Sequence, residues 1–139
     1  MIYNHWSCGD YSENLNFNKR GSETCAIERT TEYSTNGQYS VKLTGDTWDW
    51  IGVKIINLNL PCNNIQMKGD VKSSGDSRMV ANAVYVDNTS EQFNVNFSEG
   101  ETTPLITINS EKIIQTLELQ FTLKHDNGTM FIDNIKILV

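Results

Sequence analysis

The chain has 139 residues, a formal net charge of −6 at pH 7 and a hydrophobic fraction of 38%. This composition excludes intrinsic disorder, and no apolar run approaches the roughly 20 residues that a membrane-spanning helix needs. The acidic balance argues against nucleic acid and anionic membranes as partners and suits a neutral or cationic ligand. The length is that of one domain, so we expect a single domain over residues 1–139, excised from or appended to a larger protein.

Alternation between apolar and polar residues is the main structural signal, and it predicts half-buried strands along most of the chain. Such strands are expected, in chain order, at residues 39–44, 65–72, 93–97 and 117–124. Residues 80–86 are small or apolar on both faces, which is typical of a central strand between two layers. Short turn sequences that contain glycine separate these segments. About nine or ten short strands without a long helix predict an all-β fold, an antiparallel β-sandwich of the jelly-roll type.

Residues that perform catalysis are hard to find in this chain. His5 and His125 stand outside any metal-ligand or nucleophile motif, and we expect His125 to be a solvated turn residue. Glu99 and Glu101 flank a turn glycine, where a hydrated acidic turn is a better interpretation than the acid and base of a glycosidase. We therefore predict that the domain is not an enzyme.

The cysteines do not identify a site either. Cys8, Cys25 and Cys62 match no zinc pattern and no Cys-x-x-Cys redox motif. One disulfide with a free thiol and three buried thiols both remain open.

Three aromatic residues are candidates for ligand binding. Trp48 and Trp50 are two positions apart and point to the same side if the chain is extended there. Flat aromatic surfaces stack on the apolar faces of sugar rings, although either tryptophan can instead serve as a plug at the core or sheet edge. Tyr85 is either a stacking platform on the sheet surface or a buried tyrosine.

Two rows of outward polar residues add further candidates. Gln66 and Lys68 lie on one expected strand, and Gln120 and Thr122 lie on another. If the two strands are neighbours, these side chains line one face at intervals of about 7 Å and contact the hydroxyl groups of an oligosaccharide. The alternative is that each row is simply solvated.

Five segments, in this order, resemble the jelly-roll carbohydrate-binding modules that accompany xylanases, β-glucanases and other polysaccharide-active enzymes. The segments are residues 16–21, 35–43, 50–53, 67–73 and 129–137. The second is similar to the family's Gly-x-Tyr-Ser-Leu-x-Val strand, and the last is similar to its terminal Phe-Tyr-Ile-Asp-Asn-Ile strand. The resemblance implies a jelly roll that binds its ligand on the outward polar strands and at the tryptophan corner.

The resemblance does not identify a particular glycan. Relatives that bind xylan carry an arginine after the strand equivalent to residues 41–43, where this chain has Thr44, Gly45 and Asp46. Aromatic residues of the family's binding face are replaced here by Lys68 or Gln120.

The resemblance also implies a structural calcium ion at one edge of the sandwich. It makes Asp133 a ligand, together with carbonyl groups of Gly37 and Gln38, and it places Asn18 where the family has a glutamate. Aspartate and carbonyl oxygens are the ligands that Ca²⁺ prefers. Without a metal, Asp133 would need hydrogen bonds from backbone amides, because an unpaired buried carboxylate is costly.

Two functions are compatible with these observations. The first is a non-catalytic module, extracellular or at a cell surface, that binds a poly- or oligosaccharide and thereby brings attached catalytic or adhesive domains close to it. The second is a structural or protein-interaction spacer of a cell-surface or phage-tail protein. The tryptophan pair favours the first, and the scarcity of aromatic residues on the expected binding face favours the second.

Overall fold

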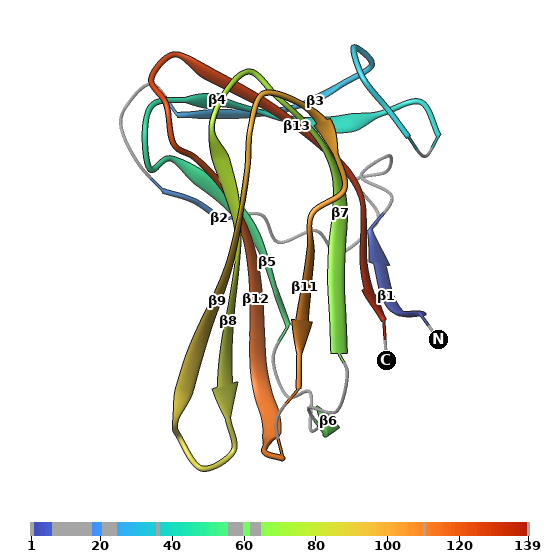
Figure 1. Ribbon diagram of the computed structural model, residues 1–139. Helices are drawn as coiled ribbons and strands as arrows, with labels where there is room; N and C mark the ends of the chain where they lie inside the picture. Colours follow the sequence, from blue (N-terminus) through green and yellow to red (C-terminus); the bar gives the residue numbers. More distant parts are fainter. Residues whose placement is uncertain are drawn as a thin grey trace.

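The computed structural model describes residues 2–6, 18–20, 25–35, 37–55, 60–61, 65–109 and 111–138. Within these ranges the secondary structure consists of thirteen strands. The described residues contain no helix long and apolar enough to cross a membrane. The strands form two antiparallel sheets that pack as a sandwich, and both ends of the chain lie close together (Figure 1). The prediction of an all-β antiparallel sandwich is confirmed.

The first sheet has seven strands. They are β1 (Ile2–Trp6), β3 (Ala26–Thr30), β4 (Ser40–Gly45), β7 (Ile65–Ser73), β10 (Gly100–Thr102), β11 (Leu105–Ile108) and β13 (Gly128–Leu138). Their order is β10–β7–β13–β4–β3, with β1 also paired to β13 and β11 also paired to β7.

The second sheet has six strands. They are β2 (Asn18–Arg20), β5 (Trp50–Ile55), β6 (Leu60–Pro61), β8 (Ser77–Tyr85), β9 (Ser90–Phe97) and β12 (Ile113–Leu123). Their order is β2–β5–β12–β8–β9, with β6 also paired to β12. The strands number more than the nine or ten expected, because β2, β6 and β10 contain only two or three residues and show no alternation in the sequence.

The core lies between the sheets and receives every second residue from the long strands. Met67 and Ile132 come from the first sheet, while Met79, Leu119 and Phe121 come from the second, and each is at most 1% exposed. Because side chains alternate along a strand, the residues between them point to the outer faces of the sandwich. Cys25 is buried as well, whereas Cys8 and Cys62 lie outside the described residues.

The two polar rows of the sequence lie on different sheets. Gln66 and Lys68 belong to β7, whose neighbours are β10, β11 and β13, whereas Gln120 and Thr122 belong to β12 between β5 and β8. The condition under which the two rows would line one face, that their strands are neighbours, is therefore not met, and the rows occupy opposite outer faces of the sandwich.

Candidate functional site

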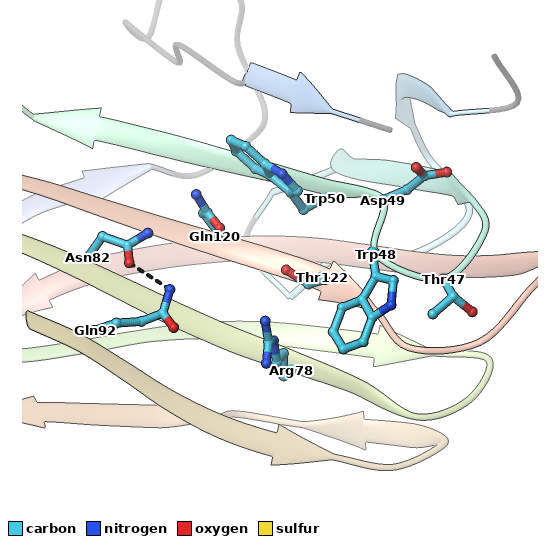
Figure 2. Close-up of a pocket in the computed structure, with 9 residues that line it drawn as sticks. All are labelled: Thr47, Trp48, Asp49, Trp50, Arg78, Asn82, Gln92, Gln120 and Thr122. Atoms are coloured by element: carbon cyan, nitrogen blue, oxygen red, sulfur yellow. Dashed lines mark hydrogen bonds between the residues drawn. The ribbon is translucent and has the colours of Figure 1, made fainter. Parts of the chain in front are cut away.

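An open cleft of about 540 Å³ lies on the outer face of the second sheet, close to the end of β12 (Figure 2). Its volume falls within the range of about 300–1,000 Å³ that is common for ligand sites. Side chains of four strands and one turn line it: Thr47, Trp48, Asp49, Trp50, Arg78, Asn82, Gln92, Gln120 and Thr122. Four of the sequence-predicted binding residues, Trp48, Trp50, Gln120 and Thr122, therefore come together in one cleft.

Strand register explains how these side chains meet. Thr122 of β12 pairs with Trp50 of β5 on one side and with Arg78 of β8 on the other. The neighbouring row, two residues along β12, places Gln120 beside Gly52. All of these residues alternate with buried core residues, so they share the outer face.

An amide pair continues the same surface away from the tryptophans. Asn82 of β8 pairs in register with Gln92 of β9, and the Gln92 Nε2 donates a hydrogen bond of 3.0 Å to the Asn82 Oδ1 (Figure 2). The Gln120 amide donates to the Glu118 carboxylate. The floor of the cleft is thus rich in oriented neutral donors and acceptors.

Trp50 is half-buried, and its position depends on the glycine two residues further along β5. A Cβ atom built on Gly52 would lie 3.1 Å from the Trp50 Cζ3 and 2.8 Å from the Leu119 carbonyl oxygen. The missing side chain of Gly52 therefore leaves room for the indole ring against the sheet.

Trp48 sits in the turn before β5 and is the most exposed large hydrophobic residue described, at 55%. Its φ angle is 76°, a left-handed conformation that a bulky residue rarely adopts. Backbone hydrogen bonds hold it there, since the Trp48 N–H donates to the Leu123 carbonyl at 2.7 Å and the Leu123 N–H donates to the Asp49 carbonyl at 2.9 Å. Both tryptophans reach the cleft as expected, but the left-handed turn rather than an extended strand directs Trp48.

Side-chain hydrogen bonds join this turn to the loop between β12 and β13, which connects the two sheets. The Asp126 carboxylate accepts from the Thr47 backbone N–H at 3.1 Å and from the Thr47 hydroxyl at 2.8 Å, and these bonds lower the pKa of Asp126. The Asp46 carboxylate accepts from the Asn127 N–H at 3.0 Å. The rim of the cleft that carries Trp48 is consequently held to the loop that connects the two sheets.

Arg78 was not predicted from the sequence, although it lines the cleft beside Trp48. Its guanidinium carbon lies 4.9 Å from the centre of the Trp48 ring, within the range of a cation–π contact. Arg78 and Asn82 occur where the alternation is weak, since β8 carries small or apolar residues on both faces, and Gln92 precedes the alternating part of β9. The available signal was the spacing of Arg78 and Asn82, which are four residues apart and therefore share a face of a strand.

Three candidates do not contribute to the cleft. Tyr85 is 0% exposed, and its hydroxyl donates a 3.0 Å hydrogen bond to Glu91, so its role as a surface stacking platform is wrong. Gln66 and Lys68 are half-buried on the outer face of the first sheet and take no part in the lining.

The residues expected to hold calcium come from different parts of the sandwich, and Gly37 and Gln38 lie in the connection between β3 and β4. Asp133 of β13 is fully buried, and the backbone N–H groups of Thr35 and Asn134 donate to its two carboxylate oxygens at 2.7 and 2.8 Å. Asn18 belongs to β2 in the other sheet. No group of three metal-binding side chains occurs among the residues that the structure describes. Calcium stays a prediction. The buried carboxylate accepts hydrogen bonds from two backbone amides and, at 3.4 Å, from the Thr35 hydroxyl, so it does not require a metal ion to offset the cost of its burial.

Asp70 of β7 lies beside Asp133 and shares its partners. The Thr35 hydroxyl donates to Asp70 at 2.5 Å, the Asn134 amide at 3.0 Å and the Thr103 hydroxyl at 2.8 Å. Burial raises the pKa of Asp70, but these hydrogen bonds outweigh it and hold the pKa below its ordinary value. Asp70 is therefore stabilised as a carboxylate by neutral donors.

The fold of this chain is similar to that of several proteins of known structure. No protein-family model and no curated protein matches the sequence. The xylan-binding domain CBM22-1 of Paenibacillus barcinonensis Xyn10C is similar in structure, with 15% identity, a TM-score of 0.74 and coverage of 99% of this chain and 93% of that one. TmCBM61, solved with β-1,4-galactotriose, is 11% identical, with a TM-score of 0.58 and 88% of each chain covered.

A third similar structure comes from a bacteriophage. The enzymatically active domain of tailspike protein 4 of bacteriophage CBA120 is 11% identical, with a TM-score of 0.68 and coverage of 90% of this chain and 19% of that one. The chain therefore has the jelly-roll fold of carbohydrate-binding modules, as the sequence resemblance implied. The same fold also forms part of a much longer phage protein.

Proposed function

We propose that this domain is a non-catalytic carbohydrate-binding module that holds a poly- or oligosaccharide in the cleft over β5, β12 and β8. The observation that carries the proposal is the presence of two tryptophans and several neutral polar side chains in one open cleft. Indole surfaces pack against the apolar faces of sugar rings, while amide and hydroxyl groups exchange hydrogen bonds with sugar hydroxyls.

The lining suits binding better than glycoside hydrolysis. Most glycosidases place two carboxyl groups on either side of the bond that breaks. Among the described lining residues the one carboxylate is that of Asp49, which is 2% exposed and accepts a 2.8 Å hydrogen bond from the Asp46 N–H. This arrangement supports a role in which the domain binds the glycan and leaves its chemistry to another domain.

We further propose that the domain works outside the cell as one unit of a longer chain. A bound module raises the effective concentration of an attached catalytic or adhesive domain near its polymer. The similar structures support this, because their names include a xylan-binding domain of Xyn10C and a tailspike of which this fold is a small part.

A spacer role is the second candidate, and the tailspike likeness is the observation that favours it. A spacer has no requirement for an exposed indole above a row of amides. The exposed Trp48 therefore favours the binding module over the spacer.

A binding screen of the isolated domain tests the proposal. We expect saturable binding to at least one of a panel of plant, microbial and host polysaccharides, detected by tryptophan fluorescence and calorimetry. Trp50→Ala and Trp48→Ala should each weaken it by about 10- to 100-fold, the usual effect of removing an aromatic hot spot.

Tyr39→Ala is the matched control, since it removes an aromatic ring that contacts Arg29 far from the cleft lining. Its binding should equal that of the unmodified domain. Absence of binding across the whole panel, from protein shown to be folded, would exclude the module and favour the spacer.

A further inference from the structure

Arg78 is the cationic residue among those that line the cleft, and no acidic side chain of the described residues forms an ion pair with it. The ion pairs of the described residues join Lys42 to Glu28 and Glu32 and join Lys112 to Asp87. Arg78 takes part in none of them. Within the part of the chain that the structure describes, this positive charge is attracted by the Trp48 ring and by no carboxylate at ion-pair distance.

The donors of Arg78 are also incompletely used. Its Nε is buried and has no hydrogen-bond partner among the described residues. The indole ring attracts the charge but offers no oxygen acceptor, whereas a guanidinium group carries five N–H donors in a planar fork. Buried polar groups are nearly always hydrogen-bonded in folded proteins, so this atom needs an explanation.

The side chains that surround Arg78 in the cleft do not neutralise its charge, so the site favours an anionic ligand over a cationic one. Thr122 of β12, the register partner of Arg78, is neutral. Asn82, four residues after Arg78 on β8, carries a neutral amide.

The carboxylate of Asp49 is buried and hydrogen-bonded to the Asp46 N–H. Glu118 shares this face of β12 beside Asn82, but it lies outside the cleft lining, two rows from Arg78, and accepts a hydrogen bond from the Gln120 amide. Of the charged groups that line the cleft, Arg78 is therefore the one available to an ionic ligand.

We infer that the cleft takes an acidic glycan, with the carboxylate of a uronic acid residue on the Arg78 guanidinium and the sugar rings against the indoles of Trp48 and Trp50. A carboxylate matches the guanidinium fork with two parallel hydrogen bonds, which are stronger than bonds between neutral groups. This inference rests on the proposed function, and it names the class of sugar that the module binds.

The net charge of −6 does not oppose this binding at close range. At physiological ionic strength charges more than about 8 Å apart on the surface are largely screened. Contact with Arg78 therefore determines the preference, and the whole-chain charge lowers only the rate of encounter with an acidic polymer. The expectation of a neutral or cationic ligand, drawn from total charge, does not apply to this local site.

A matched pair of ligands tests the inference without altering the protein. We would measure binding of tetragalacturonic acid and of its methyl ester, and of xylotetraose with and without a glucuronic acid branch, by calorimetry at constant ionic strength. At least one acidic member should bind about 10-fold or more tightly than its neutral partner, because charged hydrogen bonds are stronger than neutral ones. Sulfated xylotetraose shows whether a carboxylate is required or any anion suffices.

Variants then assign the preference to a residue. Arg78→Gln should remove the difference between acidic and neutral partners, and Arg78→Lys should keep a reduced difference because it retains the charge without the fork. Lys72→Gln makes the same change of charge on the exposed outer face of the first sheet and should leave the preference intact. Near-ultraviolet circular dichroism confirms that each variant is folded.

The outcomes separate this inference from the proposed function. Neutral glycans that bind in a Trp50-dependent manner, with no gain from a carboxylate, overturn the acidic-glycan inference and leave the module in place. An acidic preference that survives in Arg78→Gln overturns the role of Arg78. No binding of any member overturns both.

Discussion

At the scale of single residues, the cleft depends on a position without a side chain. Gly52 lies on the outer face beside Gln120 and two residues after Trp50, where a Cβ would come within 2.8 Å of the Leu119 carbonyl oxygen. The backbone at this point cannot move without disturbing the pairing of β5 with β12. The orientation of Trp50 is therefore coupled to the sheet beneath it.

We predict that Gly52→Ala weakens glycan binding about 10-fold and lowers the free energy of unfolding by about 1–3 kcal/mol, the usual effect of overpacking. The added methyl group must displace the Trp50 ring or the strand. Urea denaturation and calorimetric binding measure the two effects.

Gly69→Ala is the control for stability alone. Its Cβ would lie 2.9 Å from the Phe121 Cζ in the core, away from the cleft. This variant should lose stability and keep its affinity. Equal affinity in Gly52→Ala and the unmodified domain would contradict the coupling.

At the scale of elements, β12 is the strand that builds the site. It lies between β5 and β8, so its outward residues meet Trp50 on one side and Arg78 on the other. β7 has a similar polar row, but its neighbours bring no tryptophan within the described residues. The outward polar rows of β7 and β12 look alike in the sequence, but the neighbouring strands place different side chains beside them.

We predict that Gln120→Ala weakens binding of the glycan found in the screen by about fivefold to 20-fold, because it removes a neutral hydrogen-bonding group from the cleft. Gln66→Ala makes the same change on β7 and should bind as the unmodified domain does. Calorimetry on both variants provides the comparison. Loss of binding in Gln66→Ala with full binding in Gln120→Ala would move the site to the first sheet.

Sequence periodicity predicted well which side of a strand each residue faces, but it did not predict which strands pair. Alternation correctly placed Gln120 and Thr122 outward, since side-chain direction is a local property of an extended chain. Which strands pair is set by long-range packing, so the partners of β7 and β12 were not accessible. The same limit applies to Tyr85. The sequence pattern was compatible with either side of the strand, and the packing of the two sheets shows that the side chain is buried.

At the scale of the whole molecule, the fold tolerates wide sequence change. The similar structures share 11–15% identity with this chain and keep the same sandwich. A two-layer fold needs apolar residues at alternate positions and turns between strands, and many sequences supply these. A ligand site needs particular side chains at particular neighbours, which is why the fold was easier to predict than Arg78 or the left-handed Trp48.

The buried Asp133 decides whether the sandwich needs a metal ion for its stability. Asp133 is fully buried, and the amides of Thr35 and Asn134 donate to its two carboxylate oxygens. We therefore predict that removing calcium with a chelator leaves the melting temperature unchanged within about 1 °C. A calcium site occupied at 100 times its dissociation constant would add about 2.7 kcal/mol of stability, which a thermal melt detects readily.

The variant Asp133→Ala distinguishes a carboxylate stabilised by hydrogen bonds from one that binds calcium. It leaves the N–H groups of Thr35 and Asn134 without their acceptor, so it should lower the free energy of unfolding by about 1–3 kcal/mol for each amide left unsatisfied. If amides alone satisfy the carboxylate, this loss is the same with calcium and with chelator. If calcium is bound, the unmodified domain melts lower in chelator, calcium restores it, and Asp133→Ala no longer responds to either addition.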